Sequence, residues 1–296
     1  PVDNPPGNDP PPDPGTDPPD DESPTTDPAD INTIAPNLAS AAGGTVVTIF
    51  TGGFSDDFTV TPPTVTFGGV ASTSVVAIDA VILTAEVPLI PEGSVDVQVV
   101  GSAFTGTATG FSIVAATAAG DIIVNEALPN PGGLDANRDG VQSNVDDEFV
   151  ELVNLRTTPV DVSGHTLADA TAVRHTFANP TTLPAGGSLV IFGTGNLAAA
   201  SPGFMALHES GHALSASTGG LSLNNGGDTV TLATASGDVI DTATLGASVA
   251  GMSLNRTPDG DETAALQAHM DVTGSTADAA TGGGFSPGLR VDQSAW

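Results

Sequence analysis

The chain has 296 residues and a formal net charge of −30, with 35 acidic residues against five basic ones, all of them arginine. So few cations exclude nucleic acid and anionic membrane surfaces as partners, because almost nothing could displace counterions from phosphate. Cysteine is absent, which excludes disulfides and thiolate metal sites. No apolar run reaches the roughly 18 residues of a membrane span, so no transmembrane segment is predicted.

Residues 1–30 contain 11 prolines and nine acidic residues. Proline fixes φ and removes N–H donors, and the like charges repel one another, so little here can offset the entropy of ordering. We expect a disordered or extended stalk, about 90 Å long in polyproline geometry. It is either a passive tether or a segment that docks on a neighbouring subunit. The start at Pro1 suggests a trimmed, exported product, for which a lipid anchor upstream is one option.

Short, β-branched apolar runs separated by Gly, Pro, Thr and Ser begin at Ile31, and none keeps a helical period over three turns. The pattern predicts an all-β chain with two β-sandwich domains in tandem. The first series is TVVTIF, TVTFGG, TSVVAI, VILTAEV, SVDVQVV and GFSIV; the second is DIIVNEAL, EFVELVN, SLVIFG, LSLNNGGDTVTLA and GDVIDTATL. Small residues at 115–121 predict a short hinge, and we expect the domains to span 31–116 and 117–296.

The first series carries a set of turn glycines, prolines and β-branched residues in a fixed order. They are Ile34 and Pro36, GGTVVTIFTGGF (43–54), Pro63, TVTFGG (64–69), Pro88 and EGSVDVQVV (92–100). Together they resemble an IPT/TIG domain, which is an immunoglobulin-like sandwich. Because these are turn and core residues, the resemblance implies a spacer or contact domain without catalytic residues.

The second series carries a longer set of matching pieces. They are DIIVNEAL (121–128), DEFVELVNLRTTPVDVSGHTL (147–167), RHTF (174–177), LPAGGSLVIFG (183–193), LSLNNGGDTVTL (221–232), SLNRTPDGD (253–261) and SPG (286–288). They resemble a bacterial-type lamin-tail domain, and depart from it at His165, where the family often carries tryptophan. The resemblance implies a second immunoglobulin-like sandwich that is non-catalytic and often attached to other surface modules.

The segment DANRDGVQSNVD, residues 135–146, has the spacing of a twelve-residue calcium loop. The ligand positions are Asp135, Asn137, Asp139, the Val141 carbonyl, Ser143 and Asp146, with Gly140 at the sharp turn. Calcium takes about six to eight hard oxygens, which this spacing supplies from one loop. Since strands flank the loop, we expect a structural Ca²⁺ ion rather than a sensor. The alternative is a solvated acidic turn.

Three further carboxylates could add oxygens to this calcium site. Asp147 and Glu148 follow the loop at once, and Glu126 lies on the preceding predicted strand. With so few cations in the chain, Arg256 is expected to sit in a buried or bridging ion pair.

The segment HESGH, residues 208–212, matches the HExxH signature of zinc proteases. That chemistry needs a helix, so that His208 and His212 share one face and Glu209 can activate a zinc-bound water. The neighbouring sequences AAASPGF and ALSASTGG do not predict a helix, and Gly211 lies inside the motif. Three interpretations therefore stay open: a bland loop, a surface zinc site without catalysis, and a protease site.

Taken together, these patterns predict an exported, non-catalytic, calcium-stabilised protein of the cell surface or extracellular space. We expect a structural or adhesive role, with other protein subunits or cell-surface components as partners. A self-assembling fibre subunit, which would be a homopolymer, is one form of that role. The alternatives are a monomeric surface module that binds a protein or glycan, and a zinc metalloprotease acting through HESGH.

Overall fold

The structure is a computed structural model that describes residues 31–52, 61–102, 104–200 and 211–296. Over these residues the chain is all-β, which confirms the predicted fold class, and its helices are the short 3-10 turns η1 (Leu197–Ala199) and η2 (His269–Asp271). No helix in the described ranges is long and apolar enough to span a membrane. The stalk predicted at 1–30 lies outside the described residues.

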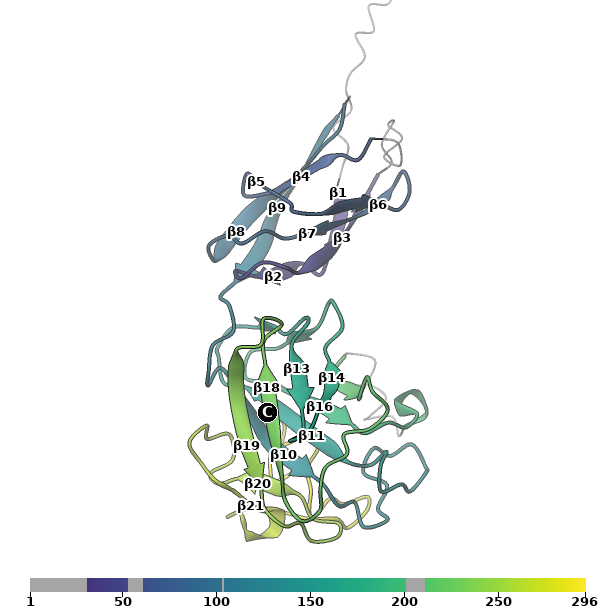
Figure 1. Ribbon diagram of the computed structural model, residues 1–296, viewed down its shortest axis with the longest axis vertical. Helices are drawn as coiled ribbons and strands as arrows, with labels where there is room; N and C mark the ends of the chain where they lie inside the picture. Colours follow the sequence, from purple (N-terminus) through teal and green to yellow (C-terminus); the bar gives the residue numbers. More distant parts are fainter. Residues whose placement is uncertain (1–30, 53–60, 103, 201–210) are drawn as a thin grey trace, which may run out of the picture.

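Two β-sandwiches follow one another along the long axis of the molecule (Figure 1). The first is built from sheet A, in the order β1 (Ile31–Ala35), β3 (Val46–Thr51), β7 (Ile82–Glu86) and β6 (Val75–Ala77). Packed on it is sheet B, in the order β2 (Leu38–Ser40), β9 (Thr105–Val114), β8 (Gly93–Val100), β4 (Thr64–Phe67) and β5 (Val70–Ala71).

The core of the first sandwich follows from strict alternation along its strands. In β3, Val47 and Ile49 are fully buried whereas Val46 and Phe50 point outward, as a strand with one buried face requires. The opposite sheet contributes the same alternation and the Phe67–Phe111 ring pair, whose centroids lie 5.4 Å apart. The first sandwich therefore closes around aliphatic residues and one aromatic pair.

The second sandwich uses residues 122–268 in three sheets. Sheet C has the order β17 (Ala213–Ser215), β16 (Ser188–Phe192), β11 (Phe149–Asn154), β10 (Ile122–Leu128), β20 (Leu254–Arg256) and β21 (Leu266–Ala268). Sheet E has the order β14 (Val173–Thr176), β13 (Thr166–Ala168), β18 (Asp228–Ala233) and β19 (Val239–Leu245). Sheet D is the short pair β12 (Val160–Asp161) and β15 (Thr182–Leu183).

Strands β10 and β11 at the centre of sheet C are buried on both faces along their whole length. One face packs on sheet E through an aliphatic core that includes Leu152 and Leu232. The other face is covered by an aromatic cluster in which Phe149 contacts Phe192 and Phe285, with ring centroids 5.7 and 6.3 Å away. The end of the chain is thus an integral layer of this sandwich.

The two sandwiches meet through polar contacts near β2 and β12. Thr45 Oγ1 donates to Asp161 Oδ2 at 2.5 Å, and both side chains are buried. The Asn179 amide, in the orientation its neighbours favour, donates to the Val46 carbonyl at 3.0 Å and accepts from the Val46 N–H at 2.6 Å. These contacts join the first sandwich directly to the second.

The linker between the sandwiches is also held. Arg156 Nη1 donates to the Ala115 carbonyl at 3.2 Å and lies 3.5 Å from Asp121 Oδ2. His165 Nε2 lies 3.2 Å from Thr117 Oγ1. The segment predicted as a short hinge is therefore anchored to the second sandwich along its length.

Candidate functional site

The predicted calcium loop forms a series of tight turns closed by its own side chains. Asp135 Oδ2 accepts from the Gly140 N–H at 3.0 Å, Asn137 Oδ1 from the Asp139 N–H at 3.0 Å, and Asp139 Oδ1 from the Val141 N–H at 2.9 Å. Gly140 has φ +89, the left-handed conformation expected at the sharp turn. The loop therefore adopts the local geometry that its spacing predicts.

The six predicted ligand positions differ in what they offer to a cation. Asn137 is fully buried, Asp135, Asp139, Ser143 and Asp146 are half-buried, and the Val141 side chain is exposed. Asp135 Oδ1 is buried without a hydrogen-bond partner among the described residues. Asp139 Oδ2 accepts from the Asn196 N–H at 2.8 Å, and Asp146 Oδ1 from Thr194 Oγ1.

The loop 135–146 fits a calcium ion only if neutral oxygens join its carboxylates. Within the described part of the chain, no group of three or more acidic or histidine side chains could hold a metal by itself. A cation here would need neutral oxygens from Asn137, Ser143 and the Val141 carbonyl beside the carboxylates, which calcium accepts. The orphaned Asp135 oxygen fits that donor set.

The three extra carboxylates proposed from the sequence do not line the loop as free ligands. Both oxygens of Asp147 accept backbone N–H groups, from Asn137 at 3.0 Å and Ser143 at 2.8 Å. Glu126 is fully buried elsewhere, because Ser253 and Ser286 hydroxyls donate to it at 2.6 and 2.8 Å. The interpretation of Glu126 as a calcium ligand was therefore wrong.

Glu148 turns away from the loop toward residues 222 and 223. Its Oε2 accepts from the Leu223 N–H at 3.2 Å. Burial raises the pKa of Glu148 to about 7, against the opposing effect of the backbone hydrogen bonds from Leu223 and Ser222. Glu148 thus supports the neighbouring loop, and its carboxyl is not free for the cation.

The HESGH segment can be judged only at its end. His208 and Glu209 lie outside the described residues. His212 is half-buried, its carbonyl accepts from the Val190 N–H at 2.9 Å, and β17 begins at the next residue. The motif therefore leads into a strand, whereas the zinc-protease chemistry needs a helix through both histidines.

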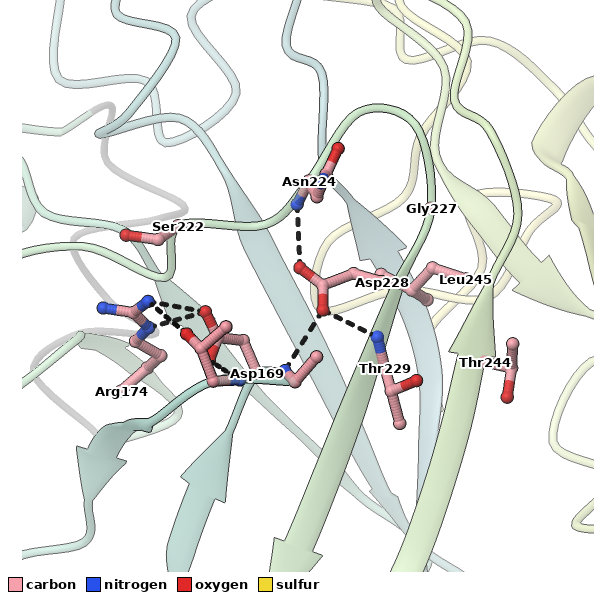
Figure 2. A pocket seen from close by; sticks show the side chains of 11 residues that line it. Asp169, Arg174, Ser222, Asn224, Gly227, Asp228, Thr229, Thr244 and Leu245 are labelled. Atoms are coloured by element: carbon pink, nitrogen blue, oxygen red, sulfur yellow. Dashed lines mark hydrogen bonds and ion pairs between the residues drawn. The ribbon is translucent and has the colours of Figure 1, made fainter.

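A polar basin at one end of sheet E was not anticipated from the sequence (Figure 2). It has a volume of about 550 Å³ and is formed by the turn after β13, the loop before β18 and the end of β19. The lining residues are Asp169, Ala170, Thr171, Arg174, Ser222, Asn224, Gly227, Asp228, Thr229, Thr244 and Leu245.

An ion pair and a capped carboxylate make the frame of the basin. Arg174 Nε and Nη2 donate to Asp169 Oδ2 at 2.8 and 2.6 Å, and Nη2 also donates to Thr171 Oγ1 at 3.1 Å. Asp228 accepts from the N–H groups of Ala170, Asn224 and Thr229 at 3.1, 2.8 and 2.7 Å. Asp228 thereby ties together the separate segments that surround the basin.

A second buried cluster holds the end of the chain against sheet C. Glu126 and Glu151 are directly opposite on β10 and β11, and both are fully buried. Burial, together with the nearby Glu126, raises the pKa of Glu151 well above its ordinary value. His269 also lies 3.7 Å from Glu126, and despite the opposing effect of burial this carboxylate raises the pKa of His269.

The expected ion pair of Arg256 is confirmed. Its Nη2 donates to Asp241 Oδ2 at 2.7 Å, and its Nε to the Val124 carbonyl at 2.9 Å. The guanidinium is buried and joins β20 to β10 and β19. Arg256 is a structural residue of the second sandwich.

Residues 115–247 match the family model described as the Lamin Tail Domain. The match confirms the lamin-tail resemblance over that part of the second sandwich, and ends before the predicted pieces at 253–261 and 286–288. The IPT/TIG resemblance of the first sandwich stays a prediction. Among curated proteins, none matches the chain significantly.

Several solved structures are similar to parts of the chain. The mixed-linkage glucan utilization locus protein SGBP-B of Bacteroides ovatus, in complex with a mixed-linkage heptasaccharide, is 12% identical, with a TM-score of 0.27 and coverage of 75% of this chain and 44% of that one. Gamma-CGTase from an alkalophilic Bacillus clarkii is 14% identical, with a TM-score of 0.25 and coverage of 57% and 24%. An auxiliary nutrient binding protein from Bacteroides thetaiotaomicron is 14% identical, with a TM-score of 0.24 and coverage of 79% and 63%. The chain thus spans less than two thirds of the length of each.

Proposed function

We propose that this chain is a non-catalytic structural module of an exported protein, in which two sandwiches act as one rigid spacer at the cell surface or in the extracellular space. The observation that carries the proposal is the buried contact between Thr45 and Asp161, supported by Asn179 on the Val46 backbone. If the two sandwiches moved independently, the Thr45 hydroxyl and the Asp161 carboxylate would separate and face water. Burying them together favours one fixed arrangement, because a buried polar group without a partner costs free energy.

Rigidity is tested by comparing the wild type with Thr45→Val, which keeps the side-chain volume and removes the donor. Residual dipolar couplings of the wild type should fit one alignment tensor for both sandwiches. In Thr45→Val, Asp161 Oδ2 loses the donor from the other sandwich, so the sandwiches should require separate tensors. Thr48→Val, on the outer face of β3, is the matched control. Independent tensors in the wild type would refute the rigid spacer.

We further propose that calcium braces the second sandwich through the loop 135–146. The support is the glycine-centred turn together with the buried, orphaned Asp135 oxygen. If the dissociation constant is about 0.1–1 mM, millimolar calcium would add about 0.4–1.4 kcal/mol to the free energy of unfolding. The larger effect would be local ordering of the loop and relief of carboxylate repulsion.

Calorimetric titration of calcium into the EDTA-treated chain tests this brace. Asp135→Asn should weaken binding at least several-fold, whereas Asp271→Asn, an exposed acidic residue of η2, should leave it unchanged. Absence of a binding heat, with no calcium-dependent shift in melting temperature, would rule out the brace.

A specific observation also supports self-assembly, the second candidate function. The outer face of sheet A exposes Phe50 (36%) and Val76 (55%), and the turn between β6 and β7 at the edge of this sheet exposes Ile78 (58%) and Val81 (40%). A second copy of the chain could cover this face, since exposed apolar clusters commonly mark association sites. Light scattering in calcium and in EDTA should detect large assemblies that Ile78→Asp abolishes; a monomer in both conditions would favour a surface binding module.

A further inference from the structure

The basin on sheet E combines a fixed frame with unoccupied hydrogen-bonding groups (Figure 2). The carboxylate of Asp228 is engaged by the three N–H groups described above, and that of Asp169 by Arg174 at Oδ2 and by the Ala172 N–H at Oδ1, 2.7 Å away. In contrast, Arg174 Nη1 and the hydroxyls of Ser222 and Thr229 have no hydrogen-bond partner among the described residues. The basin therefore offers polar groups that its own frame does not use.

Two of the hydroxyls in the basin are held in register by the sheet. Thr229 on β18 pairs directly with Thr244 on β19, and both line the basin. Directly opposite residues of an antiparallel pair carry their Cβ atoms about 5 Å apart. This spacing allows both threonines to contact neighbouring polar groups on one small ligand.

The charge of the basin selects against ionic ligands. Arg174 is neutralised by Asp169, and Asp228 adds a second carboxylate, so an anion would meet net negative charge. A cation gains little, because the oxygens of Asp228 already accept backbone N–H groups. The most compatible ligand is neutral and carries several donors and acceptors.

The lining residues and the volume of the basin narrow the class of ligand further. None of the described residues that line it is aromatic, so these residues offer a flat heteroaromatic ligand no ring to stack on. The volume of about 550 Å³ lies within the usual range for small-ligand sites. We infer that the basin binds a neutral sugar unit of a glycan, through Arg174, Ser222 and the Thr229–Thr244 pair. This inference goes beyond the proposed spacer role and does not depend on it.

The test uses the full-length chain and glucose, galactose, mannose and N-acetylglucosamine as probes, followed by amide chemical shifts in NMR. At least one sugar should shift the signals of Ser222, Gly227 and Thr229 with a dissociation constant of about 1–10 mM, as expected for an open monosaccharide site. Glucuronate should bind at least several-fold more weakly than glucose, because of the net negative charge.

The double variant Thr229→Val, Thr244→Val removes both hydroxyls and keeps two β-branched strand residues, so the fold should be retained. It should weaken binding about tenfold, corresponding to about 1.4 kcal/mol. Thr242→Val, on the same strand outside the basin, is the matched control. No shift with any of the four sugars at about 50 mM, where a millimolar site would be nearly saturated, overturns the inference. So does unchanged binding by the double variant, or stronger binding of glucuronate than of glucose.

Discussion

Replacing Asp169 by asparagine probes the ion pair between Asp169 and Arg174 in the basin. Burial alone would raise the pKa of this carboxyl, yet the hydrogen bonds from Arg174, Ala172 and Thr171 lower it to about 2, from an ordinary value of 3.8. The Asp169 side chain is 3% exposed, so solvent screens its carboxylate little. Since one pKa unit corresponds to about 1.36 kcal/mol, ionised Asp169 contributes about 2 kcal/mol to the free energy of unfolding at neutral pH.

The sign of the pH dependence follows from the lowered pKa. The unfolded chain binds a proton at Asp169 at higher pH than the native chain does, so this contribution is complete above about pH 4 and lost as the pH falls toward 2. Asp169→Asn should therefore destabilise the chain by about 2 kcal/mol at neutral pH, with a smaller gap to the wild type near pH 2.5. Urea unfolding can be followed by the fluorescence of Trp296, the only tryptophan.

Asp238→Asn is the matched control for this experiment. Asp238 is exposed and precedes β19 in the same sheet, where its carboxylate accepts from the Ser236 hydroxyl at 2.7 Å. It should change the free energy of unfolding by less than about 0.5 kcal/mol. A gap between Asp169→Asn and the wild type that stays constant down to about pH 2.5 would refute the reasoning, because the loss would then not come from the charge.

Three further predictions concern the second sandwich. Glu151→Gln should stabilise the chain at pH 8. Because the pKa of Glu151 is raised, the native chain keeps a proton on this carboxyl above pH 4.5, and the free energy of unfolding of the wild type falls as the pH rises. In urea unfolding, the free energy of unfolding of the variant should fall less steeply with rising pH than that of the wild type. Phe149→Ala should cost about 3–5 kcal/mol by opening a cavity under two aromatic rings, against less than about 1 kcal/mol for half-exposed Phe50→Ala; equal losses would contradict the packing described. Gly195→Ala should lower the melting temperature more than Gly237→Ala. Both glycines have positive φ, but only alanine at position 195 places a Cβ 2.3 Å from Asn137 Nδ2. Indistinguishable melting temperatures of the two variants would exclude that clash.

The local geometry of the loop 135–146 could be predicted from the sequence because its turns close within twelve residues. Hydrogen bonds such as those of Asp135 with Gly140 and Asn137 with Asp139 span two to five positions. Runs such as VVTIF and EFVELVN likewise predicted strands, because they are rich in β-branched residues. Local chemistry, in both cases, was sufficient.

The basin and the buried carboxylates could not be read in the same way, since their partners come from distant segments. Asp169 and Asp228 are tied through Ala170 across 58 positions, and Glu126 meets Ser286 across 160. Glu126 and Glu151 look like ordinary solvent-facing residues within their strands, and nothing nearby predicts their burial. The hydrogen-bond donors that stabilise these buried carboxylates come close to them only when the chain is folded.

The arginine ion pairs have a consequence for survival outside a cell. Trypsin-like proteases cut after lysine or arginine, and this chain has no lysine and five arginines. Arg138, Arg156, Arg174 and Arg256 are each paired with an aspartate, Arg290 stacks on Trp296 at 4.3 Å, and none of the five is exposed. Cleavage at any of them would first require local unfolding, so the pairs that balance a few carboxylates also leave the folded chain without a ready site for this large class of proteases.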